Sequence, residues 1–278
     1  MNIKKLAAFS LGTIGGNPAG VVVVEGKLPA SEEMQDVAAK VGFSETVFAL
    51  AHDDGWLVRY FSPEAEVPFC GHATIALAAA VAMQQGDGTF RIQTASGDLV
   101  EVEGRRVSAE LGEAAFLSPP SSNTLLSPPD LNSALRLFAL DHSQLSAQIP
   151  PAVIYAGANH LLLPLRERAA LADMSYDFSA GQAMMREKGW VTIMLITAES
   201  DTLIHARNAF AYGGVVEDPA TGAAAAALCG YLRTLGYRAG APIEIHQGDD
   251  IGVPCRLYAN IPADPSGRVR VRGTARFL

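Results

Sequence analysis

The chain has 278 residues, of which 49% are hydrophobic and 18% are charged, and its formal net charge is −8. This composition supports a buried core and excludes a disordered chain, while an acidic chain without a basic stripe argues against nucleic-acid binding. Three cysteines do not make a disulfide framework, and no apolar run approaches the ~18 residues of a membrane span. We therefore expect a cytoplasmic protein with no membrane partner.

Apolar periodicity and turn residues predict the elements in chain order. In the first part, strands are predicted at Lys5–Phe9, Val21–Val24, Thr46–Ala51, Trp56–Phe61, Thr89–Thr94, Asp98–Glu103 and Arg106–Leu111, with a Gly-rich connection at Gly12–Gly20 and helices at Ser31–Val41 and His72–Gln85. The segment Ser118–Asp130 is rich in proline and serine and is predicted to be a linker. After it, helices are predicted at Leu131–Leu140, Met184–Lys188 and Thr221–Leu235, and strands at Val153–Ala156, His160–Leu163, Val191–Thr197, Leu203–Phe210, Ile243–Gln247, Val253–Ala259 and Val269–Arg272.

The order of elements repeats. Each half has a glycine that opens an alanine-rich helix and a later glycine followed by aspartate, and both pairs are separated by 151 positions (71 to 222 and 97 to 248). A chance match between two alanine-rich helices is the alternative, but two glycines at one offset favour a duplication. The halves are then expected to fold alike and to face each other across a cleft.

The two helix starts at Gly71 and Gly222 are candidate anion sites. Free backbone N–H groups and the positive end of the helix dipole meet there, and small residues let a ligand approach the backbone. The alternative is that each glycine only permits the turn. Duplication of the feature favours a site for a carboxylate.

Glu45 is the first candidate for acid–base chemistry. It lies between a helix end and the apolar run Val47-Phe48, so partial burial would raise its pKa toward neutrality. An ordinary solvent-facing glutamate is the competing interpretation. His72 and Asp218 are further candidates, and for them the alternatives are a satisfied polar residue at a helix start and a helix cap.

Cofactor and metal motifs are not found. The six histidines show no paired metal-ligand spacing, and neither a Walker motif nor a dinucleotide fingerprint occurs. No metal and no cofactor are therefore predicted.

Several motifs resemble the signature of the PhzF-like, or phenazine biosynthesis-like, family, which belongs to the diaminopimelate-epimerase fold superfamily. They occur in family order: Gly16-Asn17-Pro18-Ala19, Phe43-Ser44-Glu45-Thr46, Arg59-Tyr60-Phe61-Ser62-Pro63, Pro68-Phe69-Cys70-Gly71-His72-Ala73-Thr74 and Glu217-Asp218-Pro219-Ala220-Thr221-Gly222. The resemblance implies an α+β fold of two similar domains, 1–117 and 118–278, each a curved, barrel-like sheet around a central helix. It allows the last strand to return to the first domain, and it implies a homodimer.

The resemblance also implies an activity: a cofactor-independent isomerase that moves a proton on a small carboxylate-bearing substrate, such as a dihydroanthranilate-like ring acid. Glu45 would carry the proton, and His72 and Asp218 would orient the substrate and tune the site. Residues expected to form the substrate pocket are Ser44, Gly71, Ala73, Gly222 and Ala223.

Two alternatives remain open on the residues. Racemases of the superfamily use two opposed cysteines, and here the corresponding positions hold Cys70 and Thr221, so an amino-acid racemase would need a partner other than cysteine. The second alternative is a binding protein without efficient catalysis, since Ala223 and Val253 replace polar residues expected in the family. For an enzyme, we expect the two domains to close over the ligand about the linker.

Overall fold

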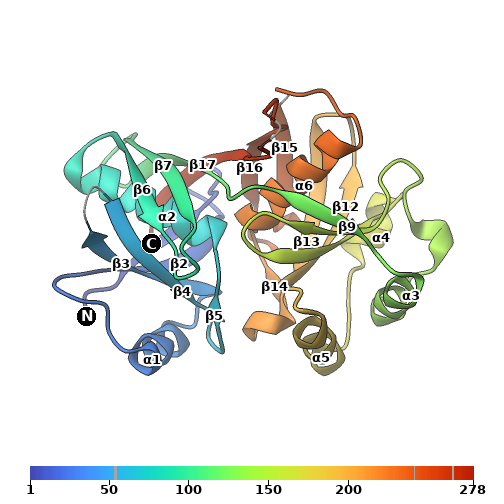
Figure 1. The fold of residues 1–278 in the computed structure, drawn as a ribbon, viewed down its shortest axis with the longest axis horizontal. Helices are drawn as coiled ribbons and strands as arrows, with labels where there is room; N and C mark the ends of the chain where they lie inside the picture. The colour runs from blue at the N-terminus through green and yellow to red at the C-terminus, as the bar shows by residue number, and fades with distance from the viewer. Residues whose placement is uncertain (53–54, 241, 265) are drawn as a thin grey trace.

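The computed structural model describes residues 1–52, 55–240, 242–264 and 266–278, and it shows two lobes side by side (Figure 1). Each lobe is a curved sheet wrapped around one central helix, α2 (Gly71–Gln85) in the first lobe and α6 (Gly222–Thr234) in the second. The predicted α+β class and the two similar halves are confirmed. Within the described ranges, none of the helices combines the length and apolarity that a membrane crossing requires.

The first lobe is a closed barrel. Each strand pairs with the next and the last pairs with the first, in the order β1 (Lys4–Ala8), β2 (Asn17–Val24), β3 (Glu45–His52), β4 (Gly55–Phe61), β6 (Gly88–Gln93), β7 (Leu99–Arg106), β8 (Leu111–Leu117) and β17 (Arg270–Phe277). The helix α1 (Ser31–Val41) packs outside, and the short β5 (Glu66–Val67) pairs with β4.

The second lobe repeats this plan with an open sheet. Its strands are β9 (Ser122–Leu125), β10 (Ala152–Tyr155), β11 (Asn159–Pro164), β12 (Thr192–Ala198), β13 (Leu203–Ala209), β14 (Glu217–Asp218), β15 (Pro242–Gln247) and β16 (Cys255–Asn260). Its outer helices are α3 (Pro128–Leu137), α4 (Arg168–Ala172) and α5 (Phe178–Lys188), and its 3-10 turns are η1 (His142–Gln144), η2 (Ala211–Gly213) and η3 (Asp249–Ile251).

Strand directions support the duplication. The pair β2–β3 is parallel with α1 between its strands in the chain, and β11–β12 is parallel with α5 between them. Likewise β4–β6 and β13–β15 are parallel pairs that enclose α2 and α6 in the chain. An ion pair also repeats at one place, as Arg59 with Glu66 and Arg207 with Glu217.

The central helices are buried on all sides, which explains their alanine content. In α2 every residue from Gly71 to Met83 is buried, and in α6 every residue from Gly222 to Leu232. Small side chains let the sheet close on the helix. Gly104 of β7 approaches so closely that a Cβ there would lie 2.5 Å from the carbonyl oxygen of Ala78.

The predicted linker Ser118–Asp130 is correct only for its first residues, 118–121, which connect β8 to β9, and is wrong for most of the rest. Residues Ser122–Leu125 form β9, which pairs with β10, and Pro128 begins α3 behind the cap Ser127. Proline is compatible with a first helical turn because its missing N–H would have no helical acceptor there. The helix predicted at Leu131–Leu140 therefore starts and ends about a turn too late.

Other boundaries also differ. The predicted strand Arg106–Leu111 is not a strand: Arg106 ends β7, Leu111 begins β8, and residues 107–110 form the exposed turn between them. The predicted connection Gly12–Gly20 ends early, since β2 already begins at Asn17 and pairs with both β1 and β3. The helix α4 was not predicted, and α5 begins at Phe178 rather than Met184.

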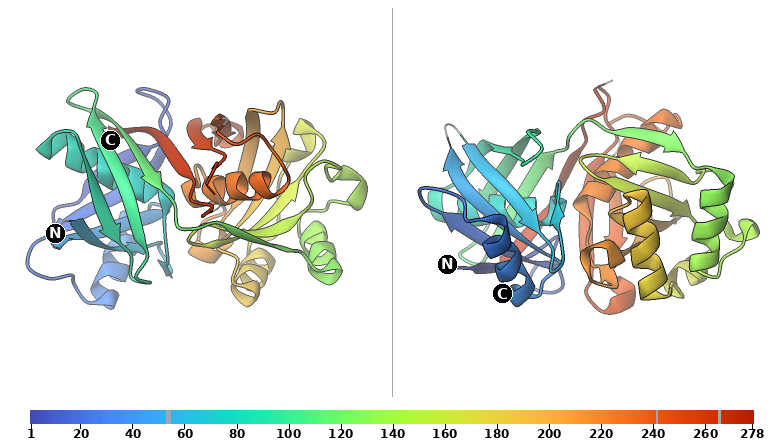
Figure 2. Two further views of the ribbon diagram at one scale, coloured as in Figure 1. Left: turned by 45° about the horizontal axis from the view of Figure 1, so that its top comes forward. Right: turned by 60° about the horizontal axis from the view of Figure 1, so that its bottom comes forward.

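Two stretches of chain join the lobes and lie side by side. The first runs from β8 toward β9, and the second is β17, which pairs with β16 of the second lobe and then with β8 and β1 of the barrel (Figure 2). Between them, the backbone N–H of Ser118 donates to the Val269 carbonyl, and the Ser118 hydroxyl accepts from the Val269 N–H. The last strand thus closes the first lobe, and any relative movement of the lobes must bend this double crossing.

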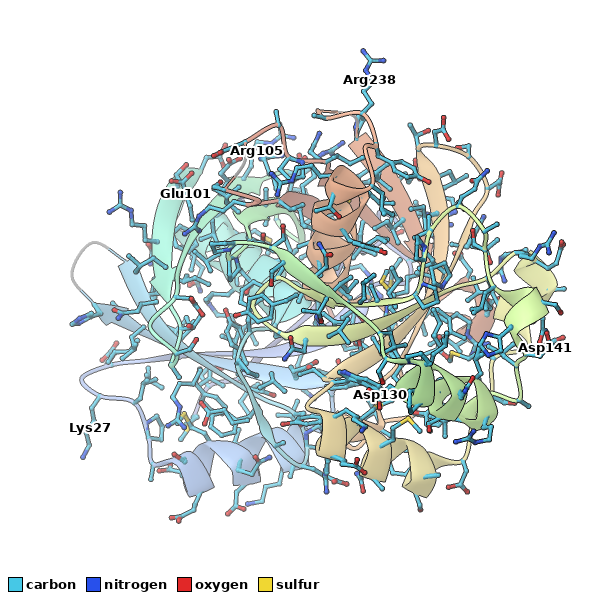
Figure 3. The ribbon with its side chains drawn as sticks, turned by 45° about the vertical axis from the view of Figure 1, so that its right-hand side comes forward. Lys27, Glu101, Arg105, Asp130, Asp141 and Arg238 are labelled. Atoms are coloured by element: carbon cyan, nitrogen blue, oxygen red, sulfur yellow. The ribbon has the colours of Figure 1, made fainter. Side chains whose placement is uncertain are left out.

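Charged side chains mostly face solvent, as the labelled Lys27, Glu101, Arg105, Asp130, Asp141 and Arg238 illustrate (Figure 3). Glu45 and Asp218 differ, because both are buried at the junction of the lobes. Among the described residues, neither forms an ion pair with a lysine or an arginine. Two buried carboxyl groups without cations mark the place to search for function.

We predict that Gly104→Ala destabilises the first lobe by about 1–3 kcal/mol, because its methyl group would overpack α2. Urea denaturation measures the change. Gly88→Ala is the matched control: Gly88 is the register partner of Gly104, and a Cβ added there would meet nothing within 4 Å. Equal stability of the two variants would contradict the tight fit around α2.

Candidate active site

The two lobes meet around one small cavity at the starts of α2 and α6. Its lining residues are Glu45, Phe69, Cys70, Gly71, His72, His160, Val191, Thr192, Phe210, Asp218, Thr221, Gly222 and Ala223. The cavity measures about 20 Å³, which is about the space that one water molecule needs. A ligand larger than this does not fit in the cavity as the lobes stand.

The two helix starts touch through their glycines. A Cβ on Gly71 would lie 2.7 Å from Gly222 Cα and 2.7 Å from the Ala223 nitrogen. Neither helix has a side-chain cap or an acidic residue in its first turn. First-turn N–H groups have no acceptor inside their helix, so both positive helix ends meet at a cavity suited to an anion.

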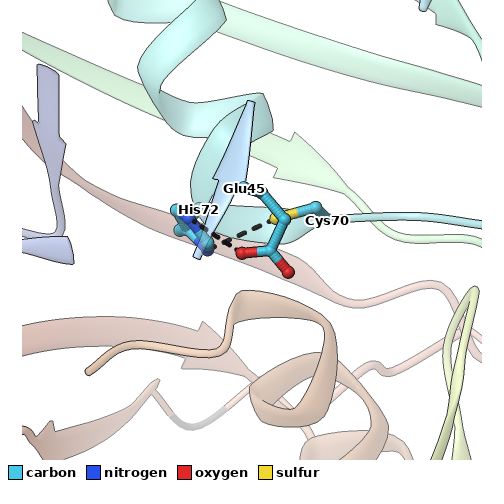
Figure 4. A group of neighbouring side chains, drawn as sticks. All are labelled: Glu45, Cys70 and His72. Atoms are coloured by element: carbon cyan, nitrogen blue, oxygen red, sulfur yellow. Dashed lines mark hydrogen bonds and ion pairs between the residues drawn. The ribbon is translucent and has the colours of Figure 1, made fainter. Parts of the chain in front are cut away.

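Glu45 is the first residue of β3 and is 4% exposed. Its Oε2 atom has no hydrogen-bond partner and lies 3.4 Å from His72 Nε2 (Figure 4). Burial raises the pKa of Glu45 well above its ordinary value, and the charge of Asp218 raises it further. The carboxyl group therefore keeps its proton to a higher pH than an ordinary glutamate does.

His72 is held in one tautomer by its neighbours. Asn17 donates from Nδ2 to the Ala220 carbonyl at 3.0 Å, so its Oδ1 accepts the Ser44 hydroxyl proton at 3.1 Å. Ser44 Oγ is then free to accept from His72 Nε2 at 3.3 Å. Burial lowers the pKa of His72 to about 3, so the ring is neutral.

Cys70 is the last member of this hydrogen-bonded series and acts as a donor. Its Sγ lies 3.3 Å from His72 Nδ1, the nitrogen that carries no proton in this arrangement. Burial, followed by the charge of Glu45, raises the pKa of the thiol well above its usual range. A protonated thiol is a weak base, and in this arrangement it can donate to His72 Nδ1.

Asp218, at the end of β14, links the lobes. Its carboxylate accepts from Asn17 Nδ2 of the first lobe at 2.5 Å and from Thr221 Oγ1 at 2.6 Å. Burial raises its pKa to about 7, although these hydrogen bonds lower it. The alternative that Asp218 caps a helix is wrong, because Thr221 is the residue before the first turn of α6 and this helix has no side-chain cap.

Most predicted site residues come together in the cavity. Glu45, His72 and Asp218 line it, as do Gly71, Gly222 and Ala223, while their individual roles stay predictions. Ser44 and Ala73 do not line it: Ser44 lies behind His72, and Ala73 is buried within α2. Sequence reasoning missed Asn17, His160 and Thr192 as site residues. Each is a buried polar residue at the start of a mostly apolar strand, and that contrast was the available signal.

The described residues include one group that could hold a metal, although the histidine spacings predicted none. Donor atoms of Glu45, Cys70 and His72 lie within 4.8 Å of one another. Thiolate, imidazole and carboxylate are ligands that Zn²⁺ accepts. The thiol must lose its proton to bind a metal, and its raised pKa opposes that loss.

Comparisons with known proteins agree with this geometry. The family model for phenazine biosynthesis-like proteins matches residues 6–278. An isomerase of Deinococcus radiodurans without an assigned substrate is 31% identical over 97% of this chain and 87% of its own length. The trans-2,3-dihydro-3-hydroxyanthranilate isomerase of Pseudomonas fluorescens is 29% identical over 98% of this chain and 95% of its own.

Among solved structures, a protein of Pseudomonas aeruginosa described as a predicted epimerase superposes with a TM-score of 0.86 at 25% identity. The superposition covers 99% of this chain and 96% of that one. Family match and fold thus extend over nearly the whole chain, with both lobes and the cavity between them. The chain therefore belongs to the PhzF-like, or phenazine biosynthesis-like, family, and it is an isomerase.

Proposed function

We propose that this isomerase moves a proton between two carbon atoms of a small carboxylic acid and that Glu45 carries the proton. The observation that carries the proposal is the buried Oε2 of Glu45, which has no hydrogen-bond partner and lines the cavity at the two helix starts. A raised pKa lets this group be deprotonated to attack and protonated to return the proton in one catalytic cycle.

The proposed reaction balances without a cofactor. The substrate carboxylate binds at the first-turn N–H groups of α2 and α6, which also stabilise charge that develops on the substrate. Glu45 removes a proton from one carbon, the C–H electrons shift into the neighbouring double bonds, and the proton returns from Glu45 to another carbon. Neutral His72 keeps its Nε2 proton, which it donates to Ser44, and its ring lies 3.4 Å from the carboxylate of Glu45.

A ring acid of the dihydroanthranilate type is the leading candidate substrate. It carries the carboxylate that the helix starts favour, and it is the substrate named for the Pseudomonas fluorescens relative. It is larger than the closed cavity, so binding requires the lobes to part at the double crossing formed by β17 and the stretch after β8. Closure then excludes water from the transferred proton.

A racemase that uses Cys70 is the second candidate, because the thiol lies in the cavity wall. The matching position in the second lobe is Thr221, whose hydroxyl donates to Asp218. The raised pKa of Cys70 and its contact with His72 both disfavour the thiolate that racemisation needs. These observations favour the glutamate mechanism.

We predict that Glu45→Gln lowers proton exchange at the substrate carbon by at least about a hundredfold, since general acid–base catalysis contributes about 10²–10⁴. Deuterium incorporation into trans-2,3-dihydro-3-hydroxyanthranilate and related ring acids, followed by NMR in D₂O, measures the effect. Cys70→Ser should retain most exchange, and Glu101→Gln, a surface carboxylate, should match the wild type. Exchange that survives in Glu45→Gln but disappears in Cys70→Ser would refute the glutamate mechanism.

We also predict that Glu45→Gln stabilises the fold more at pH 8 than at pH 5. The folded-state pKa of Glu45 lies above its ordinary value of 4.5, so folding takes up a proton and stability falls as the pH rises above that value. Glutamine cannot ionise and escapes this loss. Thermal denaturation at both pH values measures the difference, with Glu101→Gln as the control, and a gain that does not change with pH would contradict the buried, proton-holding carboxyl group.

A further inference from the structure

A second series of hydrogen-bonded side chains lies in the cavity wall, and it plays no part in the proposed proton transfer. His160 of β11 is 1% exposed, and its Nδ1 lies 2.8 Å from the Thr192 hydroxyl of β12. Thr192 in turn donates to Asn208 Oδ1 at 3.0 Å. The other ring nitrogen, His160 Nε2, is buried and has no hydrogen-bond partner, although the residue lines the cavity.

This series determines which nitrogen of His160 carries the proton. Because the Thr192 hydroxyl donates to Asn208, its oxygen can only accept from the ring, so Nδ1 must hold the hydrogen. Burial lowers the pKa of His160 to about 3, and the ring therefore carries a single proton at neutral pH. Nε2 is left as a bare acceptor, which is costly to bury unless something donates to it.

The duplication places this acceptor across the site from the catalytic carboxyl group. Glu45 is the first residue of β3 and pairs with Ala19 of β2. Thr192 is the first residue of β12 and pairs with His160 of β11 in the equivalent parallel pair. Thr192 thus corresponds to Glu45, and His160 corresponds to Ala19, so the second lobe offers hydrogen-bonding groups where the first offers the acid.

We propose that His160 is a substrate-binding residue whose Nε2 accepts a hydrogen bond from a hydroxyl or amino group of the substrate. This inference rests on the proposed function and narrows it: the substrate is a small carboxylic acid that also carries a hydroxyl or amino donor. The helix starts bind the substrate carboxylate, Glu45 exchanges the proton with the reacting carbon, and His160 accepts a hydrogen bond from the hydroxyl or amino group of the substrate. An acid without that donor leaves Nε2 unpaired in the closed site and binds more weakly.

The first test needs no substrate. In ¹⁵N-labelled protein, the signals of His160 are assigned by their loss in His160→Gln, and their shifts report the tautomer. We expect a protonated Nδ1 and a bare Nε2 that do not change between pH 5 and pH 8. A ring protonated at Nε2, or one that titrates in this range, would overturn the proposal.

The second test measures ligand selection by calorimetry with 3-hydroxyanthranilate, which carries both donors, and benzoate, which carries neither. We expect the wild type to prefer 3-hydroxyanthranilate by about tenfold, the size of one hydrogen bond. The preference should disappear in His160→Leu and persist in His160→Gln, whose amide oxygen can accept. His205→Leu, at a histidine of β13 outside the cavity lining, should behave like the wild type.

The outcomes separate the two proposals. A preference that survives in His160→Leu would overturn the role of His160 while leaving the proton transfer by Glu45 in place. Binding of neither ring acid to the wild type would count against the proposed substrate class, and the tautomer of His160 would then decide the inference about its bare nitrogen.

Discussion

The close approach of Gly71 and Gly222 is the constraint on which the site depends. A Cβ on Gly71 would lie only 2.7 Å from backbone atoms of the other helix start, so no side chain larger than hydrogen fits there, and a Cβ on Gly222 would lie 3.1 Å from Gly71 Cα, which leaves little room. The two positive helix ends therefore meet at one point between the lobes. A carboxylate bound there is attracted from both sides without a lysine or an arginine.

That arrangement lowers the free-energy cost of burying negative charge but does not remove it. Burial raises the pKa of both Glu45 and Asp218, and the charge of Asp218 raises that of Glu45 further. A substrate carboxylate would add another negative charge to the same cavity. In the proposed reaction, binding of an anionic substrate would therefore favour the protonated forms of these carboxyl groups. A group that keeps a proton near neutral pH can also deliver it, so the cost of burying these carboxyl groups and their usefulness in proton transfer have one physical origin.

The duplicated scaffold supports an asymmetric site. Both lobes supply a central helix start and a parallel strand pair to the cavity, yet the polar residues at matching positions differ: Glu45 against Thr192, Ala19 against His160, Cys70 against Thr221, and Val67 against Asp218. In the proposed reaction, the first lobe contributes Glu45, the group that exchanges protons. The second contributes hydroxyl, imidazole and carboxylate groups that hold hydrogen bonds, and Asn17 joins the two sets by binding Asp218 across the junction.

The sequence by itself determined the repeating units and their central helices. Alanine-rich segments opened by Gly71 and Gly222 and ended near Gly86 and Gly236 are local patterns, and so is the apolar strand that begins at Glu45. Local patterns also identified the three candidate catalytic residues, because each occurs inside a motif of adjacent residues. The expectation of two like halves facing each other followed from the repeat, and the α+β class followed from the resemblance of those motifs to a known family.

Only the tertiary structure decided how these units close and what the polar residues contact. The strand β17 completes the barrel by pairing with β1 from the opposite end of the chain, and the proline- and serine-rich segment becomes a strand and a helix start once β10 provides a partner. The tautomer of His72 and the unpaired Nε2 of His160 likewise depend on groups that reach them from other segments of the chain. Periodicity reports which face of an element is apolar, whereas hydrogen-bond partners and desolvation are set by residues distant in sequence that packing brings together.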